Sequence, residues 1–301
     1  MSVQPGTAGS AGSSGGFATA LVVARFALVE SLRRRVFLVV TVLTVAFLVL
    51  YGLGANFAFK EATQNGIASE DFVDAQTIAG QTIFGLAMFA TLFLGAVLAV
   101  FLTIGVVRGD AETGLLQPLV VRPLGRRWML FARWAAAAMT SAVYVLVVYA
   151  VALLITTSLG DWEPSQKLVP GLLLAFAVAN LAAFSVLASV FLSATAQGIA
   201  VFMTFGAGLT GGLLGQIGAV LSSNGLSTVA EVVTTLLPFE ALYQDGLYRL
   251  TSETVGIERV FVNLGPFGGA QEASLALFAW AVVMTVGLLL LAGSAFTRRD
   301  L

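Results

Sequence analysis

The sequence contains neither cysteine nor histidine. This absence excludes disulfides, thiolate nucleophiles, imidazole acid–base catalysis and the usual protein ligands of zinc and haem. Charged residues are also scarce, at 10% of the chain, whereas a soluble domain carries about a quarter. Hydrophobic residues make up 58% of the sequence, and the mean hydropathy is +0.95. These values predict a membrane protein.

Lysine is almost absent as well, because only Lys60 and Lys167 occur. Neither follows the glycine-rich pattern of a phosphate-binding loop, so the chain has no nucleotide-binding loop of that kind. The close acidic pair Asp110 and Glu112 has no third acid near it in the sequence, which argues against a catalytic or metal site. We therefore expect no enzymatic activity, cofactor or nucleic-acid partner for this chain alone. If ATP drives it, ATP and magnesium bind another polypeptide.

Six apolar runs each have about the 20 residues that a helix needs to cross a bilayer. They contain no Asp, Glu, Lys or Arg. They predict an all-α, polytopic membrane protein with six transmembrane helices. The predicted spans are Val36–Ala55, Ile83–Val107, Ala135–Ser158, Pro170–Leu192, Gly198–Leu221 and Ala273–Phe296.

The distribution of basic residues predicts the orientation. Of the 15 lysines and arginines, only Lys60, Lys167, Arg249 and Arg259 lie on the side opposite the N-terminus. Positively charged segments stay in the cytoplasm. We therefore expect both termini to be cytoplasmic, in the plasma membrane of a prokaryote.

The N-terminal region divides into two parts. Residues 1–16 are rich in glycine, serine and alanine and are expected to form a disordered tail. Residues 17–35 show one apolar stripe at helical spacing and predict a helix at the membrane interface. The alternative is a cytoplasmic extension of the first span. Residues 17–301 then form a single transmembrane domain.

The outer segment between the fifth and sixth spans, Ser222–Glu272, is long and rather apolar. Within it, Val229, Val232, Val233, Leu236 and Leu237 predict an amphipathic helix that ends at Pro238. The following PFEALYQDGLYRL predicts a second half-helix. We expect these helices to lie at the surface or to re-enter the membrane partly, with a small outer domain as the alternative.

The segment Arg108–Arg133 between the second and third spans carries five arginines and two acids. Asp110 is expected to cap a short helix over 111–117, because Pro118 removes a backbone donor and ends it. Such a helix, lying flat on the membrane, is suited to receive a movement from a cytoplasmic partner. Arg122, Arg126 and Arg127 are expected to contact lipid phosphates or that partner.

Small and polar residues inside the spans predict close helix packing. Gly208 with Gly212, and Gly211 with Gly215, have the spacing that lets helices approach closely, within the chain or in a dimer. Polar residues of the fourth and fifth spans favour hydrogen bonds between helices over substrate contacts. Asn180, Ser185, Thr204 and Gln216 are the candidates for a substrate path, and Gln197 lies at the connection.

The loop resembles that of the type-2 ABC transporter permeases. The resemblance rests on Asp110-x-Glu112-x-Gly114-Leu115-Leu116, on Arg122-Pro123-x-x-Arg126, and on Glu30-x-x-Arg33-Arg34-x-Val36-Phe37 near the start. The predicted topology agrees with that family over the whole chain after the tail.

The resemblance implies a permease that dimerises with a second copy or a related chain and binds two cytoplasmic ABC ATPase subunits. It also implies transport by alternating access, with the loop over 108–127 acting as the coupling element. The residues carried over are Asp110, Glu112, Gly114, Leu115, Leu116, Arg122 and Arg126 in the loop, and Glu30 and Arg33 before the first span. Two other classes stay open, namely a secondary carrier or channel and a non-transporting membrane scaffold.

Overall fold

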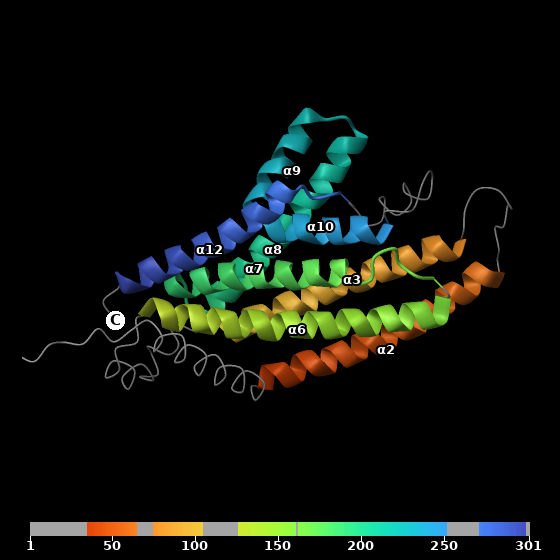
Figure 1. The fold of residues 1–301 in the computed structure, drawn as a ribbon, viewed down its shortest axis with the longest axis horizontal. Coiled ribbons are helices and arrows are strands. Elements are labelled where there is room, and N and C mark those ends of the chain that lie inside the picture. Colours follow the sequence, from red (N-terminus) through yellow and green to blue (C-terminus); the bar gives the residue numbers. More distant parts are fainter. Residues whose placement is uncertain (1–34, 65–74, 105–125, 161, 252–270, 299–301) are drawn as a thin grey trace, which may run out of the picture.

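A computed structural model describes residues 35–64, 75–104, 126–160, 162–251 and 271–298. Within these ranges all regular elements are helices (Figure 1). The helices are α2 (Arg35–Gln64), α3 (Ala75–Thr103), α6 (Arg126–Gly160), α7 (Val169–Phe191), α8 (Ala194–Val220), α9 (Asn224–Leu236), α10 (Pro238–Thr251) and α12 (Leu275–Thr297).

Six of these helices are long and apolar enough to cross a membrane, which confirms the predicted all-α fold with six spans. They are α2, α3, α6, α7, α8 and α12. The largest extensions beyond the predicted limits are in α2, which continues to Gln64, in α3, which already begins at Ala75, and in α6, which begins at Arg126. The apolar run marks only the part of a helix that meets hydrocarbon, whereas backbone hydrogen bonds continue the helix into polar surroundings.

The centre of the bundle is formed by α3, α6 and α7, which pack against one another. Gly95 of α3 marks the closest approach, because a Cβ atom there would lie 2.4 Å from Val145 Cγ2 of α6 and 3.0 Å from Val178 Cγ2 of α7. The surrounding core contains Phe84, Leu174 and Leu181, all fully buried. A small residue at this crossing lets the three backbones come together.

The outer helices of the bundle expose most of their apolar side chains. Of the residues in the most apolar part of α7, 67% are buried, compared with 17% in α2 and 22% in α12. Two hydrogen bonds between hydroxyl groups link α2 to α6, one between Thr44 and Tyr144 and one between Tyr51 and Thr156. Figure 1 shows α2 and α12 on opposite sides of the central helices. Their exposed faces are suited to contact lipid or another membrane protein.

The helices α8, α9 and α10 pack together as one unit. Gly211 and Gly215 of α8 lie against Val233 and Ala230 of α9, so the two helices run antiparallel. At Leu237 the chain turns by 104° into α10, which packs against α7. The predicted amphipathic helix and the half-helix after Pro238 are therefore both present, and the glycine pairs of α8 serve packing within the chain.

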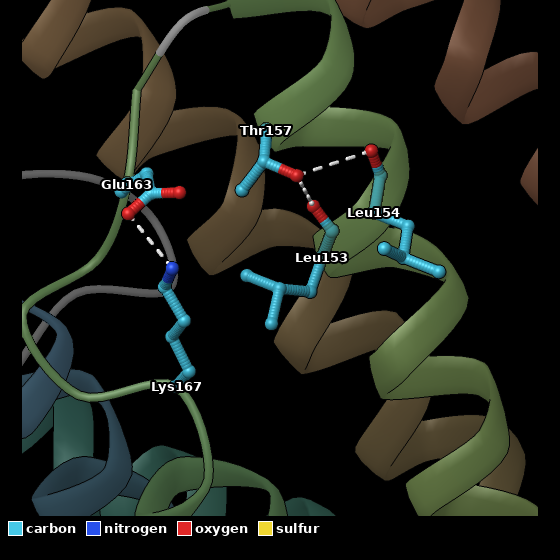
Figure 2. A network of polar contacts seen from close by, with 5 residues as sticks. All are labelled: Leu153, Leu154, Thr157, Glu163 and Lys167. Atoms are coloured by element: carbon cyan, nitrogen blue, oxygen red, sulfur yellow. Dashed lines mark hydrogen bonds and ion pairs between the residues drawn. The ribbon is translucent and has the colours of Figure 1, made fainter.

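The connection between α6 and α7 is short and held by polar contacts. Tyr149 Oη donates to the carbonyl of Lys167 at 3.0 Å. Figure 2 shows Lys167 Nζ paired with Glu163 Oε2 at 2.7 Å, beside the α6 terminus, where Thr157 Oγ1 donates to carbonyls of its own helix. Both charged side chains are largely exposed, so this ion pair contributes little to stability.

Several predicted features lie outside the described residues. These are the tail over 1–16, most of the interfacial helix over 17–35 and the coupling helix over 111–117. They stay predictions.

Candidate functional site

A buried polar cluster joins three helices at the end of the bundle where α3 ends. Gln197 Nε2 donates to the carbonyl of Thr103 at 3.0 Å, and to the carbonyl and Oγ of Ser185 at 3.1 and 3.0 Å. Thr103 Oγ1 also donates to Ser185 Oγ at 2.7 Å. All three side chains are fully buried. We call Thr103, Ser185 and Gln197 the Gln197 cluster.

The sequence places Thr103 and Gln197 where helices end or begin, whereas Ser185 lies inside α7, before its last residue Phe191. Thr103 is the last residue of α3, and Gln197 lies in the first turn of α8, just after the two-residue connection from α7. The last four carbonyls of a helix lack partners within it. The Gln197 amide therefore satisfies a carbonyl at the end of α3 with a donor from α8.

A second polar cluster lies on the buried face of α10. Asp245 has no exposed surface, and it accepts from Arg249 Nε at 2.8 Å and from the backbone N–H of Ala273 at 3.0 Å. Glu240 is 4% exposed and accepts from Gln244 Nε2 at 3.3 Å through Oε1. Its Oε2 has no hydrogen-bond partner among the described residues. We call Glu240, Gln244, Asp245 and Arg249 the α10 cluster.

The α10 cluster lies against the spanning helices. A Cβ atom on Gly212 of α8 would lie 2.5 Å from Glu240 Oε1 and from Gln244 Nε2. Gly212 is roughly 12 Å along the helix axis from the last residue of α8. Gly246 and Leu247 of α10 face α3, where they lie against Met88 and Gly85. The acids of α10 are thus packed among membrane helices.

The α9–α10 pair enters and leaves this region from the same end of the bundle. α9 follows the end of α8, and Asp245 of α10 binds Ala273, which lies just before the start of α12. Trp280 of α12 donates to the carbonyl of Thr235 near the end of α9 at 2.6 Å. The pair is therefore a bent helical element that folds back against the bundle between α8 and α12.

Comparison with known proteins decides what this helical architecture belongs to. The family model described as ABC-2 family transporter protein matches residues 21–301. The chain is a member of the ABC-2 transporter family. It is therefore an integral membrane permease of an ABC transporter, and its family works with ATPase subunits and typically lacks a nucleotide site of its own. A search of curated proteins finds no significant match.

Most of the coupling residues predicted for this ABC-2 permease lie outside the described residues. Arg126 is the first residue of α6, and the remainder stay predictions: Glu30, Arg33, Asp110, Glu112, Gly114, Leu115, Leu116 and Arg122. The structure does place both ends of their loop, since α3 ends at Thr103 and α6 begins at Arg126. Among the residues that the structure describes, no group of three or more acidic, His or Cys side chains is placed to hold a metal ion.

The four candidates for a substrate path are separated in the ABC-2 fold. Asn180 is buried in α7, where its Nδ2 donates to Thr285 Oγ1 of α12 at 2.8 Å, and Ser185 belongs to the Gln197 cluster. Thr204 Oγ1 donates to the Ala200 carbonyl of its own helix at 2.9 Å. Gln216 lies toward the far end of α8 and is partly buried. Asn180 and Ser185 thus make the predicted hydrogen bonds between helices.

The α10 cluster was missed by sequence reasoning. The six predicted apolar runs carry no charged residue, but α10 brings Glu240 and Asp245 against the spanning helices from the connection between α8 and α12. One signal was present: Glu240 with Gln244, and Asp245 with Arg249, are each four residues apart and share a helix face with apolar neighbours. Their burial could not be read from that spacing.

We expect Glu240→Gln to keep the ABC-2 permease folded and to raise its stability by about 1 kcal/mol. The reason is that burying a carboxylate with an unpartnered oxygen costs free energy, which a neutral amide lowers. The measurement is the midpoint of thermal unfolding in detergent, with Gln244→Glu as the control that adds a third buried acid and is expected to destabilise. A lower midpoint for Glu240→Gln would contradict this prediction.

Proposed function

We propose that this ABC-2 permease moves its substrate by alternating access, driven by two separate cytoplasmic ATPase subunits that dock on the loop over 108–127. The observation that carries the proposal is the position of this loop. It connects α3 and α6, two helices of the central core, and the end of α3 that leads into it is bonded to the start of α8. A push on the loop would therefore reach the centre of the bundle directly.

Charge supports the cytoplasmic location of this end. The loop contains several arginines, among them Arg108 and Arg122. Two further arginines are exposed at the same end of the bundle, namely Arg127 at the start of α6 and Arg298 just after α12. A Cβ atom on Gly293 of α12 would lie 3.3 Å from Arg127 Cγ, which places these two helix ends side by side. Basic segments of this kind remain cytoplasmic. We therefore place the α9–α10 pair on the outer side.

The proposed complex contains a second permease copy, which is either the same chain or a related one. The exposed apolar faces of α2, α8 and α12 offer surface for it, with lipid covering what remains. A substrate path between two such copies would leave the α10 cluster near its outer half. The uncharged spans favour lipid-like, hydrophobic or peptide substrates over small ions.

The decisive experiment is capture of the tagged permease from native membranes in mild detergent, followed by mass spectrometry. We expect an ATPase with a phosphate-binding loop at near one-to-one ratio. Charge reversal by Glu112→Arg or Arg126→Glu is expected to lower the captured ATPase about tenfold or more, because reversing a docked charge leaves its partner unpaired.

The matched control is Lys167→Glu, a charge reversal at the other end of the bundle, where Lys167 is exposed. This variant is expected to retain the ATPase. Capture of a well-folded permease without any ATPase would overturn the proposed function. Unchanged capture and unchanged ATPase stimulation in both loop variants would instead remove Glu112 and Arg126 from the coupling role.

A secondary carrier is the second candidate, because the α10 cluster supplies what a carrier needs, namely buried acidic groups packed among membrane helices. In that case the purified permease in liposomes would transport without an ATPase. A scaffold would show neither transport nor an ATPase partner. Capture of the ATPase separates both alternatives from the ABC permease.

A further inference from the structure

In the Gln197 cluster, the end of α3, which leads into the predicted coupling loop, is hydrogen-bonded to α7 and α8. After Thr103 only Ile104 is described before the loop, and a Cβ atom on Gly198 would be in ordinary contact with Ile104 Cδ1 at 3.8 Å. Ser185 belongs to α7, and Gln197 to α8. One amide thus connects the end of α3 and the start of α8 to the last part of α7.

These hydrogen bonds are strong candidates for a mechanical link because they lie in dry protein. The three side chains have no exposed surface, and hydrogen bonds at low local dielectric are electrostatically stronger than in water. Breaking one would leave a buried donor or carbonyl without a partner, at a cost of about 1–3 kcal/mol. The ends of α3, α7 and α8 are therefore expected to move as one body.

Contact between α3 and α8 is otherwise sparse along their lengths. The rings of Phe93 and Phe205 meet with centroids 6.0 Å apart, but such an apolar contact can slide. The amide of Gln197 is directional, since its donors must point at particular oxygens. It therefore fixes the position of α8 relative to the end of α3 in a way that ring packing does not.

In its second half α8 packs against the α9–α10 pair. Gly208 lies against Phe239, Gly212 against Glu240, and Gly211 against Val233. A displacement of α8 as a rigid helix is thus passed to α9 and α10. Gln197 lies in the first turn of α8, and Gly212, which faces the α10 cluster, lies in its second half.

We infer that Gln197 is a positioning residue that joins the predicted coupling loop to α8, so that movement of the loop is transmitted to the α9–α10 pair. This inference rests on the proposed function, because it needs an ATPase that moves the loop. Gln197 itself touches neither the ATPase nor the substrate in this mechanism.

The test uses Gln197→Met, which keeps an unbranched side chain of similar size but removes the amide donors. The matched control is Asn180→Leu, which removes another fully buried amide of similar shape, one that links α7 to α12 through Thr285. The natural chain has no cysteine, so Leu154→Cys on α6 and Leu213→Cys on α8, both at exposed positions, give a unique pair for spin labels.

Labelled permease is mixed with excess unlabelled copies, assembled with the captured ATPase, and studied without nucleotide and after trapping with ATP and vanadate. In the otherwise natural chain, trapping is expected to shift the distance between the two labels. In Gln197→Met the shift is expected to be lost, while the ATPase binds at the same ratio and still hydrolyses ATP. Asn180→Leu is expected to retain the shift, which a merely structural role for Gln197 would not predict.

The outcomes separate the inference from the proposed function. If no ATPase binds the natural permease, the proposed function fails. If the ATPase binds and Gln197→Met shows the same shift as the natural chain, the inference is wrong and the proposed function stands. The absence of any shift in the natural complex would likewise overturn the role given to α8. If Gln197→Met elutes as an aggregate, Gln197→Ala, which removes the same amide donors with a smaller side chain, is measured in its place and decides by the same criteria.

Discussion

Asp245→Ala is expected to lower the free energy of unfolding by about 3 kcal/mol or more. Asp245 is fully buried, and its removal takes the carboxylate that pairs with Arg249 out of the contact. It also leaves the backbone N–H of Ala273 without its acceptor. Breaking a buried ion pair from one side is strongly destabilising, because the remaining charge stays poorly solvated. The α10 helix would also lose its bond to the segment before α12.

The measurement is the midpoint of thermal unfolding in detergent, where a loss of this size corresponds to a drop of about 6–12 °C. Glu163→Ala is the control, because Glu163 forms an ion pair with Lys167 at the same spacing of four residues but at an exposed position. It is expected to change stability by less than about 1 kcal/mol. Asp245→Asn keeps an acceptor for Ala273 and is expected to fall between the two. Equal effects of Asp245→Ala and Glu163→Ala would show that α10 is not buried as described.

Gly95→Ala is expected to destabilise the bundle by about 1–3 kcal/mol, the usual cost of overpacking a tight core. The new methyl group would meet Val145 and Val178 at the crossing of the three central helices. Both neighbours are β-branched, so their side chains have few alternative rotamers. The backbones must therefore separate, and the whole core around Gly95 loses contacts.

Gly54→Ala is the matched control, since Gly54 also lies inside a spanning helix but a Cβ atom there would meet nothing within 4 Å. It is expected to be neutral or to stabilise α2 by up to about 1 kcal/mol through helix propensity. Thermal midpoints of both variants in the same detergent provide the comparison. A tolerated Gly95→Ala would mean that α3, α6 and α7 do not approach as closely as the structure shows.

Part of the candidate site was accessible from the sequence. Asn180, Ser185 and Gln197 stand out as polar residues in apolar surroundings, and a buried polar group needs a partner. The hydrogen bonds between helices were therefore predictable as a class. That Gln197 reaches Thr103, far away in the sequence, was not, because the choice of partner depends on how the helix ends are packed.

The burial of the α10 cluster, by contrast, could not be predicted from the sequence. Hydropathy assigns PFEALYQDGLYRL to an outer connection because it contains Glu240, Asp245 and Arg249. In the structure the segment is buried, because the glycines of α8 leave room for it and α7 covers its other side. Burial of a charged residue is a property of its neighbours, and these come from distant parts of the chain.

The sequence by itself determined the class of protein, the six spans, the two helices of the outer connection and the resemblance to the ABC-2 family that the family model bears out. These follow from local composition and periodicity, because the bilayer imposes length and apolarity on every span separately. Only the tertiary structure decided that α10 folds back among the spans and that Gln197 fastens α3 to α8. Both depend on which helices meet, and in hydrocarbon that choice is made by close packing and by partners for buried polar groups.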